Sequence, residues 1–285
     1  MAIPIEVLVS WSKPGKSDTS KITYEAIKTI IENNLGYNYD IFLQGSYHNI
    51  TYIKDNSDID VVVVDKGLTI NNTLYGLYGD LDSLHNFKRG LFYHIQNTNN
   101  FNFTLGNKTT KYSGNSYYVP ADIVPCAYYK GTQYGAAVGT ILYDANLGKY
   151  FINYPRQHYD NGVLKSSLTN DNFKKTVRMF KNARNYAVKE NILSSKDIAP
   201  SYFLECLIYN VPNTAFLGNE SDIFFNVLKW LCDNRQNLTN MKCQNGIQNL
   251  FGYDVSNITY KKWNTSDAIT FIDKITYMWN NWRLL

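Results

Sequence analysis

Two predicted strands flanked by short polar motifs constrain the fold of this chain more than any other feature. Residues 39–44 predict a short strand that ends at Gly45-Ser46, where a helix can begin. Residues 59–64 form a β-branched run bounded by polar residues, which indicates a second strand. An Asp-Ile-Asp tripeptide at 58–60 opens this second strand, eleven residues after the glycine–serine pair. We therefore expect a tight turn and two carboxylates at the ends of neighbouring strands.

Asp58 and Asp60 are the first candidate metal ligands. Side chains alternate along a strand, so these two carboxylates are expected to point the same way while Ile59 points into the core. Adjacent carboxylates repel each other unless a cation lies between them, and Mg²⁺ prefers carboxylate oxygen. Asp122 is flanked by apolar residues in the predicted strand 117–124 and is the best candidate for a third carboxylate. Together these aspartates predict a two-metal catalytic site.

Gly45 and Ser46 are candidate phosphate ligands. Glycine lets the backbone approach a phosphate closely, amides at a helix start point at an anion, and the serine hydroxyl adds a hydrogen bond. Taken alone, an Asp-x-Asp sequence is often only a solvated strand end, and a Gly-Ser pair is usually only a turn. Their combination in this order, followed by the strand that carries Asp122, favours metal-dependent phosphate chemistry over these structural roles.

The remaining pattern of the amino-terminal half is mixed. Residues 17–33 predict a helix with one apolar face, which Gly36 ends. A helical stretch is predicted near 74–87 and a strand at 91–96. The strand at 117–124 is expected at a sheet edge or a strand end, because two prolines interrupt it.

The carboxy-terminal half is helical. Apolar residues recur at helical spacing in four segments, which predicts helices at 171–190, 201–209, 222–232 and about 266–279. The first of these carries Lys174, Arg178 and Lys181 at i, i+4 and i+7, a basic stripe that is either a solvated surface or a phosphate contact. No repeat and no long linker divides the sequence. We therefore expect an α+β fold, with a mixed β-sheet flanked by helices and packed against a helical carboxy-terminal lobe.

Composition narrows the class of protein and partner. A formal net charge of +4 is mild and argues only weakly for a long nucleic-acid partner. The four cysteines are scattered without CxxC spacing, which indicates neither a zinc ribbon nor a redox motif. The start has no basic region, and the longest strongly apolar run, Val61–Val64, is far below a membrane span. We therefore expect a cytoplasmic protein without a membrane partner.

The sequence resembles a known family of enzymes. A Gly-Ser pair followed about a dozen residues later by Asp-x-Asp on a strand is typical of the DNA polymerase beta-like nucleotidyltransferase superfamily. Within it, the chain resembles the bacterial cGAS/DncV-like nucleotidyltransferases, or CD-NTases, in a clade-E-like subgroup. The resemblance covers most of residues 20–215 and includes the segments VPADIVPCAYY, NYPRQHYDNGVLK, NFKKTVRMFKNARN and IAPSYFLECLIYNVP.

This resemblance implies a fold and an activity. Residues 1–150 would form the nucleotidyltransferase catalytic core, a palm-like sheet with a spine helix, and residues 151–285 a helical lobe that completes the nucleotide pocket. The implied enzyme is a cyclic dinucleotide synthase that joins two NTPs, releases pyrophosphate and uses two Mg²⁺ ions, for which Mn²⁺ can substitute. Its product would be a second messenger for anti-phage (CBASS) signalling, read by a separate effector protein.

The resemblance also implies roles for single residues. The catalytic and metal-binding residues would be Asp58, Asp60 and Asp122. Asp122 would also help to activate the attacking 3′-hydroxyl. The nucleotide contacts would be Gln44, Gly45, Ser46, Lys165, Lys181, Ser201 and Tyr202. Among them, Lys181 would reach the β- and γ-phosphates, and the Ser201-Tyr202 pair would bind the triphosphate and stack on a base.

Three further polar residues are assigned from their chemistry. Asn153 and Asn161 are candidates for base selection, because an amide carries both a donor and an acceptor and can pair with the edge of uracil or adenine. His158 is expected to be a structural hydrogen-bonding residue, since a metal-based mechanism needs no histidine base.

Partners and competing functions follow from the same resemblance. The chain lacks the His/Cys zinc insertion with which the animal enzyme grips DNA, so we expect no DNA activator, and we expect a monomer. A related transferase could make linear oligonucleotides or modify an RNA end, although a more basic flank would then be expected. An antibiotic nucleotidyltransferase or a catalytically inactive nucleotide-binding protein could share the same fold. The complete set of three aspartates argues against the inactive protein.

Overall fold

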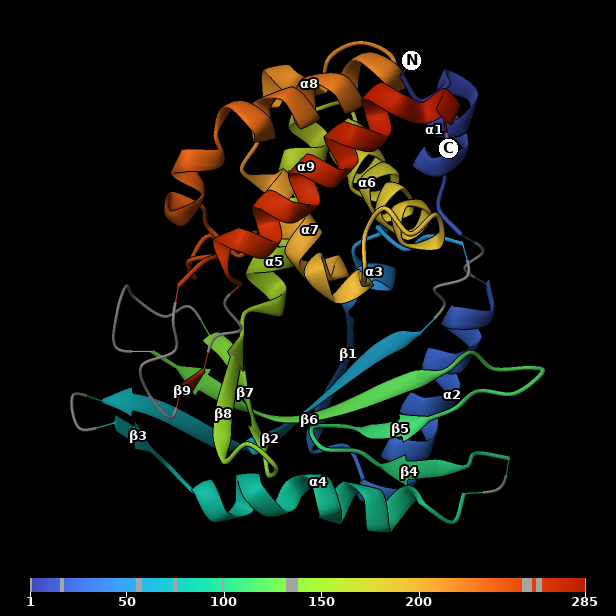
Figure 1. The fold of residues 1–285 in the computed structure, drawn as a ribbon. Helices are drawn as coiled ribbons and strands as arrows, with labels where there is room; N and C mark the ends of the chain where they lie inside the picture. Colours follow the sequence, from blue (N-terminus) through green and yellow to red (C-terminus); the bar gives the residue numbers. More distant parts are fainter. Residues whose placement is uncertain are drawn as a thin grey trace.

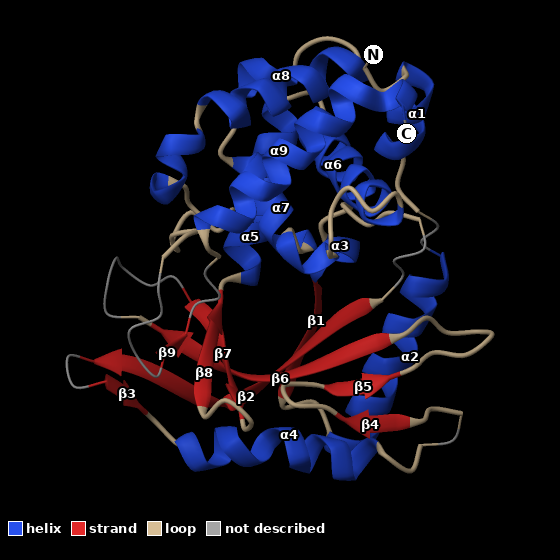
Figure 2. Cartoon of the chain, in the orientation of Figure 1, coloured by secondary structure: helices blue, strands red, loops and turns tan. Residues whose placement is uncertain are grey.

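A computed structural model describes residues 2–15, 18–54, 58–73, 76–98, 100–131, 138–252, 258–259 and 263–284. One sheet lies beneath a lobe of helices, and helix α4 (Leu81–Ile95) covers the lower face of the sheet (Figure 1). Figure 2 shows the strands gathered in one half of the molecule and most helices in the other. This arrangement confirms the predicted α+β fold.

The strands form a mixed sheet. Their bounds are β1 Tyr39–Gln44, β2 Ile59–Thr73, β3 Gly76–Tyr78, β4 Phe103–Leu105, β5 Thr110–Tyr112, β6 Ala121–Lys130, β7 Val138–Asp144, β8 Lys149–Asn153 and β9 Ile258–Thr259. Among the described residues they make one nine-stranded sheet with the order β1-β2-β6-β7-β8-β9, to which β3, β4 and β5 add at the side. The pairs β2–β6 and β8–β9 are parallel and the other pairs are antiparallel.

Strand β2 lies inside the sheet and is covered on both faces. Val61 and Val63 pack into the core that includes α2 (Asp18–Leu35) and α4, while Val62 and Val64 pack into the core on the opposite face. All four valines are fully buried. A strand that is buried on both faces needs a continuous apolar run rather than an alternating one, which explains this part of the sequence.

Helix α4 corrects two predictions. It begins at Leu81, where the carboxylate of Asp80 accepts a hydrogen bond from the Ser83 amide, and residues 76–78 before it form β3. The predicted strand at 91–96 lies inside this helix or at its end. The sequence signal in this region was mixed, but helical spacing brings three residues to the core: Leu84, Leu91 and Ile95. Residues 74–75 of the predicted helix, like Ser17 at the predicted start of α2, lie outside the described residues.

Strand β6 is an inner strand, so the predicted sheet edge is wrong, whereas the predicted strand end is confirmed at Pro120, which directly precedes Ala121. Pro125 lies opposite Val63 of β2. On the other side of β6, pairing with β5 ends at Ile123 and pairing with β7 begins at Ala127. A proline is tolerated in this gap, where no partner strand needs its missing N–H group. Pro120 precedes the strand, and its carbonyl accepts a hydrogen bond from the Ile59 amide.

The helical lobe surrounds α6. Its helices are α1 Ile5–Ser12, α5 Pro155–Leu168, α6 Asn172–Lys189, α7 Ser201–Tyr209, α8 Glu220–Asp233 and α9 Thr265–Asn281, with short 3₁₀ turns η1 Lys196–Ile198, η2 Asn213–Phe216, η3 Arg235–Asn240 and η4 Trp282–Leu284. The four predicted helices of this half are confirmed, with ends displaced by at most two residues. Helix α5 was not predicted, although Pro155 at its first position is a typical helix start.

The first helix of the chain belongs to the helical lobe rather than to the sheet. Ile3 and Leu8 pack into the same apolar core as α6, α7, α8 and α9. Figure 1 shows α1 beside the end of the chain, far from the sheet. The division of the chain at residue 150 stays a prediction. Helix α1 belongs to the first 150 residues in sequence, but it packs against helices of the second part. Within the described residues, none of the helices combines the length and the apolar character that crossing a membrane requires.

Candidate functional site

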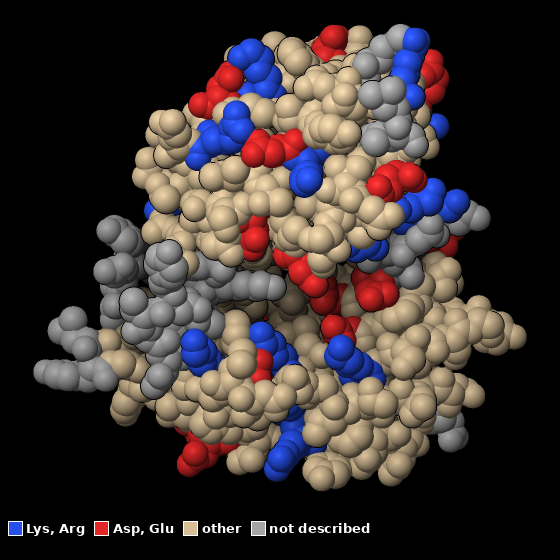
Figure 3. Space-filling view, in the orientation of Figure 1, with Lys and Arg blue, Asp and Glu red and all other residues tan. Residues whose placement is uncertain are grey.

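A cavity of about 290 Å³ lies between the sheet and the helical lobe. Figure 3 shows the molecule hollowed at this level, with acidic side chains gathered at the opening. The cavity is lined by Gln44, Gly45, Ser46, His48, Asn49, Asp58, Asp60, Asn153, Tyr154, Pro155, His158, Ser201, Tyr202 and Glu205. The structure therefore brings most of the predicted site residues together around one cavity, namely Gln44, Gly45, Ser46, Asp58, Asp60, Asn153, Ser201 and Tyr202.

Gly45 joins the two sequence motifs physically. It opens the short helix α3 (Gly45–His48) with a φ of +75°, a conformation that glycine adopts more readily than other residues. The register of β1 and β2 places Gln44 opposite Asp60. A Cβ atom at position 45 would collide with Oδ2 of Asp60. Only glycine therefore lets the turn pass this close to the carboxylate.

Asp60 and Asp122 lie side by side on parallel strands. The register of β2 and β6 pairs these two residues directly. Burial raises the pKa of Asp60 to about 7, and the nearby charges of Asp122, Asp58 and Glu205 act in the same direction. The hydroxyl of Thr109 donates to Oδ1 of Asp122 over 3.3 Å. The site thus holds more negative charge than its protein surroundings balance.

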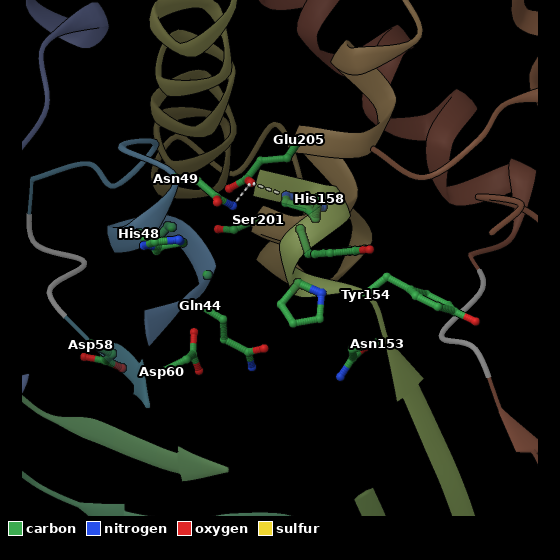
Figure 4. A pocket seen from close by; sticks show the side chains of 14 residues that line it. Gln44, His48, Asn49, Asp58, Asp60, Asn153, Tyr154, His158, Ser201 and Glu205 are labelled. Atoms are coloured by element: carbon green, nitrogen blue, oxygen red, sulfur yellow. Dashed lines mark hydrogen bonds and ion pairs between the residues drawn. The ribbon is translucent and has the colours of Figure 1, made fainter. Parts of the chain in front are cut away.

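Asp58 is placed differently from the prediction. It precedes the first residue of β2 and is exposed, and Figure 4 shows its side chain turned away from that of Asp60. Strand alternation does not apply to a residue outside the strand, which explains the difference. Among the residues that the structure describes, no three His, Cys, Asp or Glu side chains already converge as a set of metal ligands. The uncompensated charge around Asp60 nevertheless fits a hard divalent cation, which carboxylate oxygens prefer as a partner.

Ser201 and Tyr202 form the wall of the cavity that α7 contributes. Ser201 is the first residue of this helix, and its hydroxyl lies 3.5 Å from Nη1 of Arg184. The ring of Tyr202 stacks on His158 at 5.0 Å and on Trp263 at 5.7 Å between centroids. Because protein rings contact Tyr202 in this way, a base would meet the exposed part of this residue, which is 38% accessible.

The two predicted lysines do not line the cavity. Lys165 is buried, and its ammonium donates to the Val211 carbonyl at 2.7 Å and to Oδ1 of Asn213 at 3.1 Å. Burial lowers the pKa of Lys165 to about 8. Lys181 is fully buried and forms an ion pair of 2.6 Å with Glu205. Both predicted nucleotide contacts are therefore corrected, because each ammonium group is already held inside the helical lobe.

The basic stripe on α6 reaches the surface only at Lys174, which is half-buried. Arg178 is 7% exposed and Lys181 is inaccessible, because α6 runs through the middle of the helical lobe. Helical spacing correctly places these residues on one side of α6. It does not reveal that other elements cover that side.

The two asparagines predicted to select the base separate in the structure. Asn153 ends β8 and lines the cavity. Asn161 does not line it, and its amide donates to the Gln244 carbonyl at 2.8 Å. Figure 4 shows Asn153 below Tyr154 at the side of the cavity away from Asp58.

Glu205 is the main residue that the sequence analysis missed. Its carboxylate accepts hydrogen bonds from Asn49, Thr51, His158 and Lys181 at 3.0, 2.6, 3.1 and 2.6 Å. Burial alone would raise the pKa of Glu205, but Lys181 and His158 hold it well below its usual range. A glutamate inside an apolar helical run was the signal that the sequence offered, since a buried charge needs partners. His158 has the structural hydrogen-bonding position that was expected.

Comparison with known proteins extends these observations to the whole chain. The family model for the cGAS/DncV-like nucleotidyltransferase C-terminal helical domain matches residues 160–280. A cyclic UMP-AMP synthase from Rhodothermus marinus is 33% identical, with 99% of each chain covered. The cyclic nucleotide synthase CdnE01 from Staphylococcus haemolyticus is 31% identical, covering 99% of this chain and 100% of that protein.

Solved structures show the same fold. The Rhodothermus marinus CdnE c-UMP-AMP synthase with Apcpp and Upnpp has a TM-score of 0.84 at 33% identity, covering 98% of this chain and 97% of that chain. The Elizabethkingia meningoseptica CdnE cyclic dinucleotide synthase with GTP and Apcpp has a TM-score of 0.82 at 27% identity, covering 97% and 99% of the two chains.

Proposed function

Because the chain belongs to the cGAS/DncV-like nucleotidyltransferase family, we propose that it joins two nucleoside triphosphates into a cyclic dinucleotide and releases pyrophosphate. One observation carries the proposal: Gly45 passes against Asp60, which in turn lies beside Asp122. This places a backbone turn suited to phosphate next to carboxylates suited to a metal ion. Gly45 and Asp60 both line the cavity between the sheet and the helical lobe.

Asp58, Asp60 and Asp122 would hold Mg²⁺, as two ions, and Mn²⁺ can replace it. When bound, these ions stabilise the charge on the phosphate oxygens and lower the pKa of the attacking hydroxyl. Asp122 lies on the neighbouring strand, from which its carboxylate can orient the 3′-hydroxyl of the acceptor nucleotide. Asp58 has to turn toward Asp60 to join the other two, and its exposed position leaves it free to do so.

The triphosphate would lie against α3. Gly45 and Ser46 line the cavity at the start of this helix, where backbone amides and the Ser46 hydroxyl can donate to phosphate, and Gln44 precedes them. Ser201 lies across the cavity and adds a hydroxyl donor from α7. These four residues are the nucleotide contacts that the geometry supports.

Base choice would involve Asn153 and the exposed part of Tyr202. The Asn153 amide offers both a donor and an acceptor at the cavity wall, whereas the donor group of Asn161 is already engaged. Relatives of comparable identity are named for different products, cyclic UMP-AMP in one and cyclic dipurine nucleotides in another. Single side chains at the cavity wall are therefore the place to seek the difference.

We further propose that the cyclic product acts as a second messenger in anti-phage (CBASS) signalling, in the cytoplasm, where a separate effector protein reads it. The enzyme would act as a monomer and without a DNA activator. Relatives that match nearly the whole chain are cyclic nucleotide synthases, which supports the cyclic product over a linear one.

Mass spectrometry after phosphatase treatment tests the proposed reaction. The purified protein is incubated with all four NTPs and either Mg²⁺ or Mn²⁺, and the products are then treated with phosphatase. A cyclic dinucleotide has no terminal phosphate, so it survives with its mass unchanged and identifies the joined bases. A linear oligonucleotide would lose its terminal phosphates, and that result would contradict ring closure. The variant Asp60→Asn is the control for contaminating activity.

A further inference from the structure

The backbone directly after α3 is strained. Ile50 has a φ of +58°, in the left-handed region that β-branched residues strongly avoid. Such a conformation persists only where surrounding contacts enforce it, and it is most common at functional sites. Residues 49–51, called the strained turn below, connect α3 to Ile53 and to the loop that precedes β2.

Each residue of the strained turn is held by the helical lobe. Asn49 donates to Oε2 of Glu205 at 3.0 Å. The guanidinium of Arg178 donates to the carbonyl of Ile50. The carbonyl of Thr51 accepts from Lys181 at 3.0 Å, and the Thr51 hydroxyl donates to Oε1 of Glu205 at 2.6 Å. Figure 4 shows Asn49 and Glu205 meeting above the cavity.

Arg178, Lys181 and Glu205 form one buried group, called the clamp below. Their exposed fractions are 7%, 0% and 3%. Lys181 and Glu205 neutralise each other, whereas Arg178 donates to two carbonyls, those of Ser12 and Ile50. The clamp lies on α6 and α7, which are separated in sequence from the turn by more than a hundred residues. It is therefore a fixed link between the helical lobe and the catalytic sheet.

The strained turn in turn fixes α3. The amide of Asn49 donates to the Gly45 carbonyl at 3.1 Å, and the amide of Thr51 donates to the Ser46 carbonyl at 2.9 Å. These bonds reach the two residues that open α3. Gly45 has no spare room, because it lies directly against Asp60. A movement of the turn would therefore change where the α3 amides point.

We propose that Arg178, Lys181 and Glu205 are positioning residues that hold the strained turn and thereby aim Gly45 and Ser46 at the triphosphate. The inference rests on the proposed function for the identity of the ligand. Lys181 acts on the nucleotide through Thr51 and α3 rather than through a phosphate contact. The energy stored at Ile50 is the reason that a clamp is needed, since this residue would otherwise leave the left-handed region.

Replacing Arg178 tests the proposal with the least disturbance of charge, because the hydrogen bonds of its guanidinium go to carbonyl groups and not to carboxylates. In Arg178→Met, the turn should relax, and affinity for a non-hydrolysable NTP with Mg²⁺ should fall on the order of tenfold. Amide hydrogen exchange of residues 45–51, measured without nucleotide, should accelerate by a similar factor. Both measurements are made well below the melting temperature of every variant.

A second substitution at Ile50 separates positioning from general stability. Asparagine tolerates the left-handed region, whereas valine is β-branched like isoleucine. The side chain of Ile50 is 48% exposed, so a polar residue is accommodated there. Added to Arg178→Met, the change Ile50→Asn should restore most of the NTP affinity and slow the exchange of residues 45–51. Ile50→Val in the same background should restore neither.

The outcomes are distinct from those that test the proposed function. Unchanged hydrogen exchange at residues 45–51 in Arg178→Met would overturn the clamp, as would equal restoration by asparagine and valine at position 50. Faster exchange with unchanged NTP affinity would show that the turn does not position the phosphate site. A wild-type protein that binds no NTP would contradict the proposed function, while the exchange measurements would still decide whether the clamp holds the turn.

Discussion

Asp60 and Glu205 line the same cavity, but the charges that surround the two carboxylates are opposite in sign. Asp60 lies among the negative charges of Asp122, Asp58 and Glu205, and its pKa is raised to about 7 by burial and then by these charges. Glu205 lies against Lys181 and accepts hydrogen bonds from three further groups, and its cationic and hydrogen-bonding partners hold its pKa well below the usual range despite burial.

This difference separates a binding site from a scaffold. A carboxylate whose charge is balanced by its own protein gains little from a ligand and serves to join elements. A carboxylate whose charge is unbalanced costs free energy until a cation arrives, and groups of this kind cluster at functional sites. The Asp60 side of the cavity is therefore the place for metal and phosphate. The contacts on the Glu205 side fix the position of the helical lobe relative to the sheet.

Neutralising the aspartate pair should have the largest effect on activity. The double variant Asp58→Asn/Asp60→Asn keeps the side-chain size but removes two negative charges, and an amide is a poor ligand for magnesium. Product formation should fall below detection, while the melting temperature in metal-free buffer stays equal to wild type or rises. A large loss of stability would mean that the pair supports the fold. Product formed at the wild-type rate would remove the catalytic assignment.

Breaking the balanced pair should have the largest effect on stability. Lys181→Met leaves Glu205 as a buried charge without its cation, and removing one partner of such a pair costs about 3–5 kcal/mol. Denaturant unfolding should show this loss. The double variant Lys181→Met/Glu205→Gln removes both charges and should recover a substantial part of it. If Lys181→Met is as stable as wild type, the contrast between the two carboxylates is wrong.

Stability should also depend on pH in a way that sharpens the comparison. The folded-state pKa of Asp60 is raised to about 7, above its value of about 3.9 in an unfolded chain. The folded protein therefore binds the proton more tightly, and the stabilisation, complete below about pH 4, is lost as the pH rises through about 7. In metal-free buffer, the melting temperature of wild type relative to Asp60→Asn should fall from about pH 5 to pH 8. A constant difference between the two proteins would contradict this account of Asp60.

Substitution of the two asparagines should have the smallest effect. Only the change at Asn153 is expected to alter base choice. Asn153→Ser shortens a side chain at the cavity wall and should change the ratio of nucleotides incorporated from a mixture of four NTPs. Asn161→Ser removes a hydrogen bond to the Gln244 carbonyl, worth about 1 kcal/mol, and should leave the product spectrum unchanged. Mass spectrometry of the products compares them. Identical spectra from both variants and wild type would exclude Asn153 as a selecting residue.

Sequence alone predicted the sheet side of the cavity well because this side is built from local patterns. The β-branched run Val61–Val64 indicated a strand, and the positions of Gly45 and Asp60 follow once β1 and β2 pair. The neighbouring place of Asp122 needed only one more strand. Asp58 was misplaced because the alternation of a strand was extended one residue beyond its start.

The helical side of the cavity was harder to predict, because its contacts join residues far apart in the chain. The spacing of Lys174, Arg178 and Lys181 on α6 was correct, but the burial of Lys181 depends on Thr51, 130 residues away. Lys165 was assigned to nucleotide binding by resemblance, and its true partners lie in the segment that follows α7. Helical periodicity specifies which residues share a face and not what covers that face.

Thermal melting with and without Mg²⁺ and a non-hydrolysable NTP tests the central contrast most directly. A ligand that binds only the folded state raises the melting temperature by linkage. The account predicts a clear rise for wild type and for Asn161→Ser, whose side chain lies outside the cavity, and little or no rise for Asp58→Asn/Asp60→Asn. An equal rise for the aspartate variant would contradict the account, because the unbalanced carboxylates would then not be where metal and nucleotide bind.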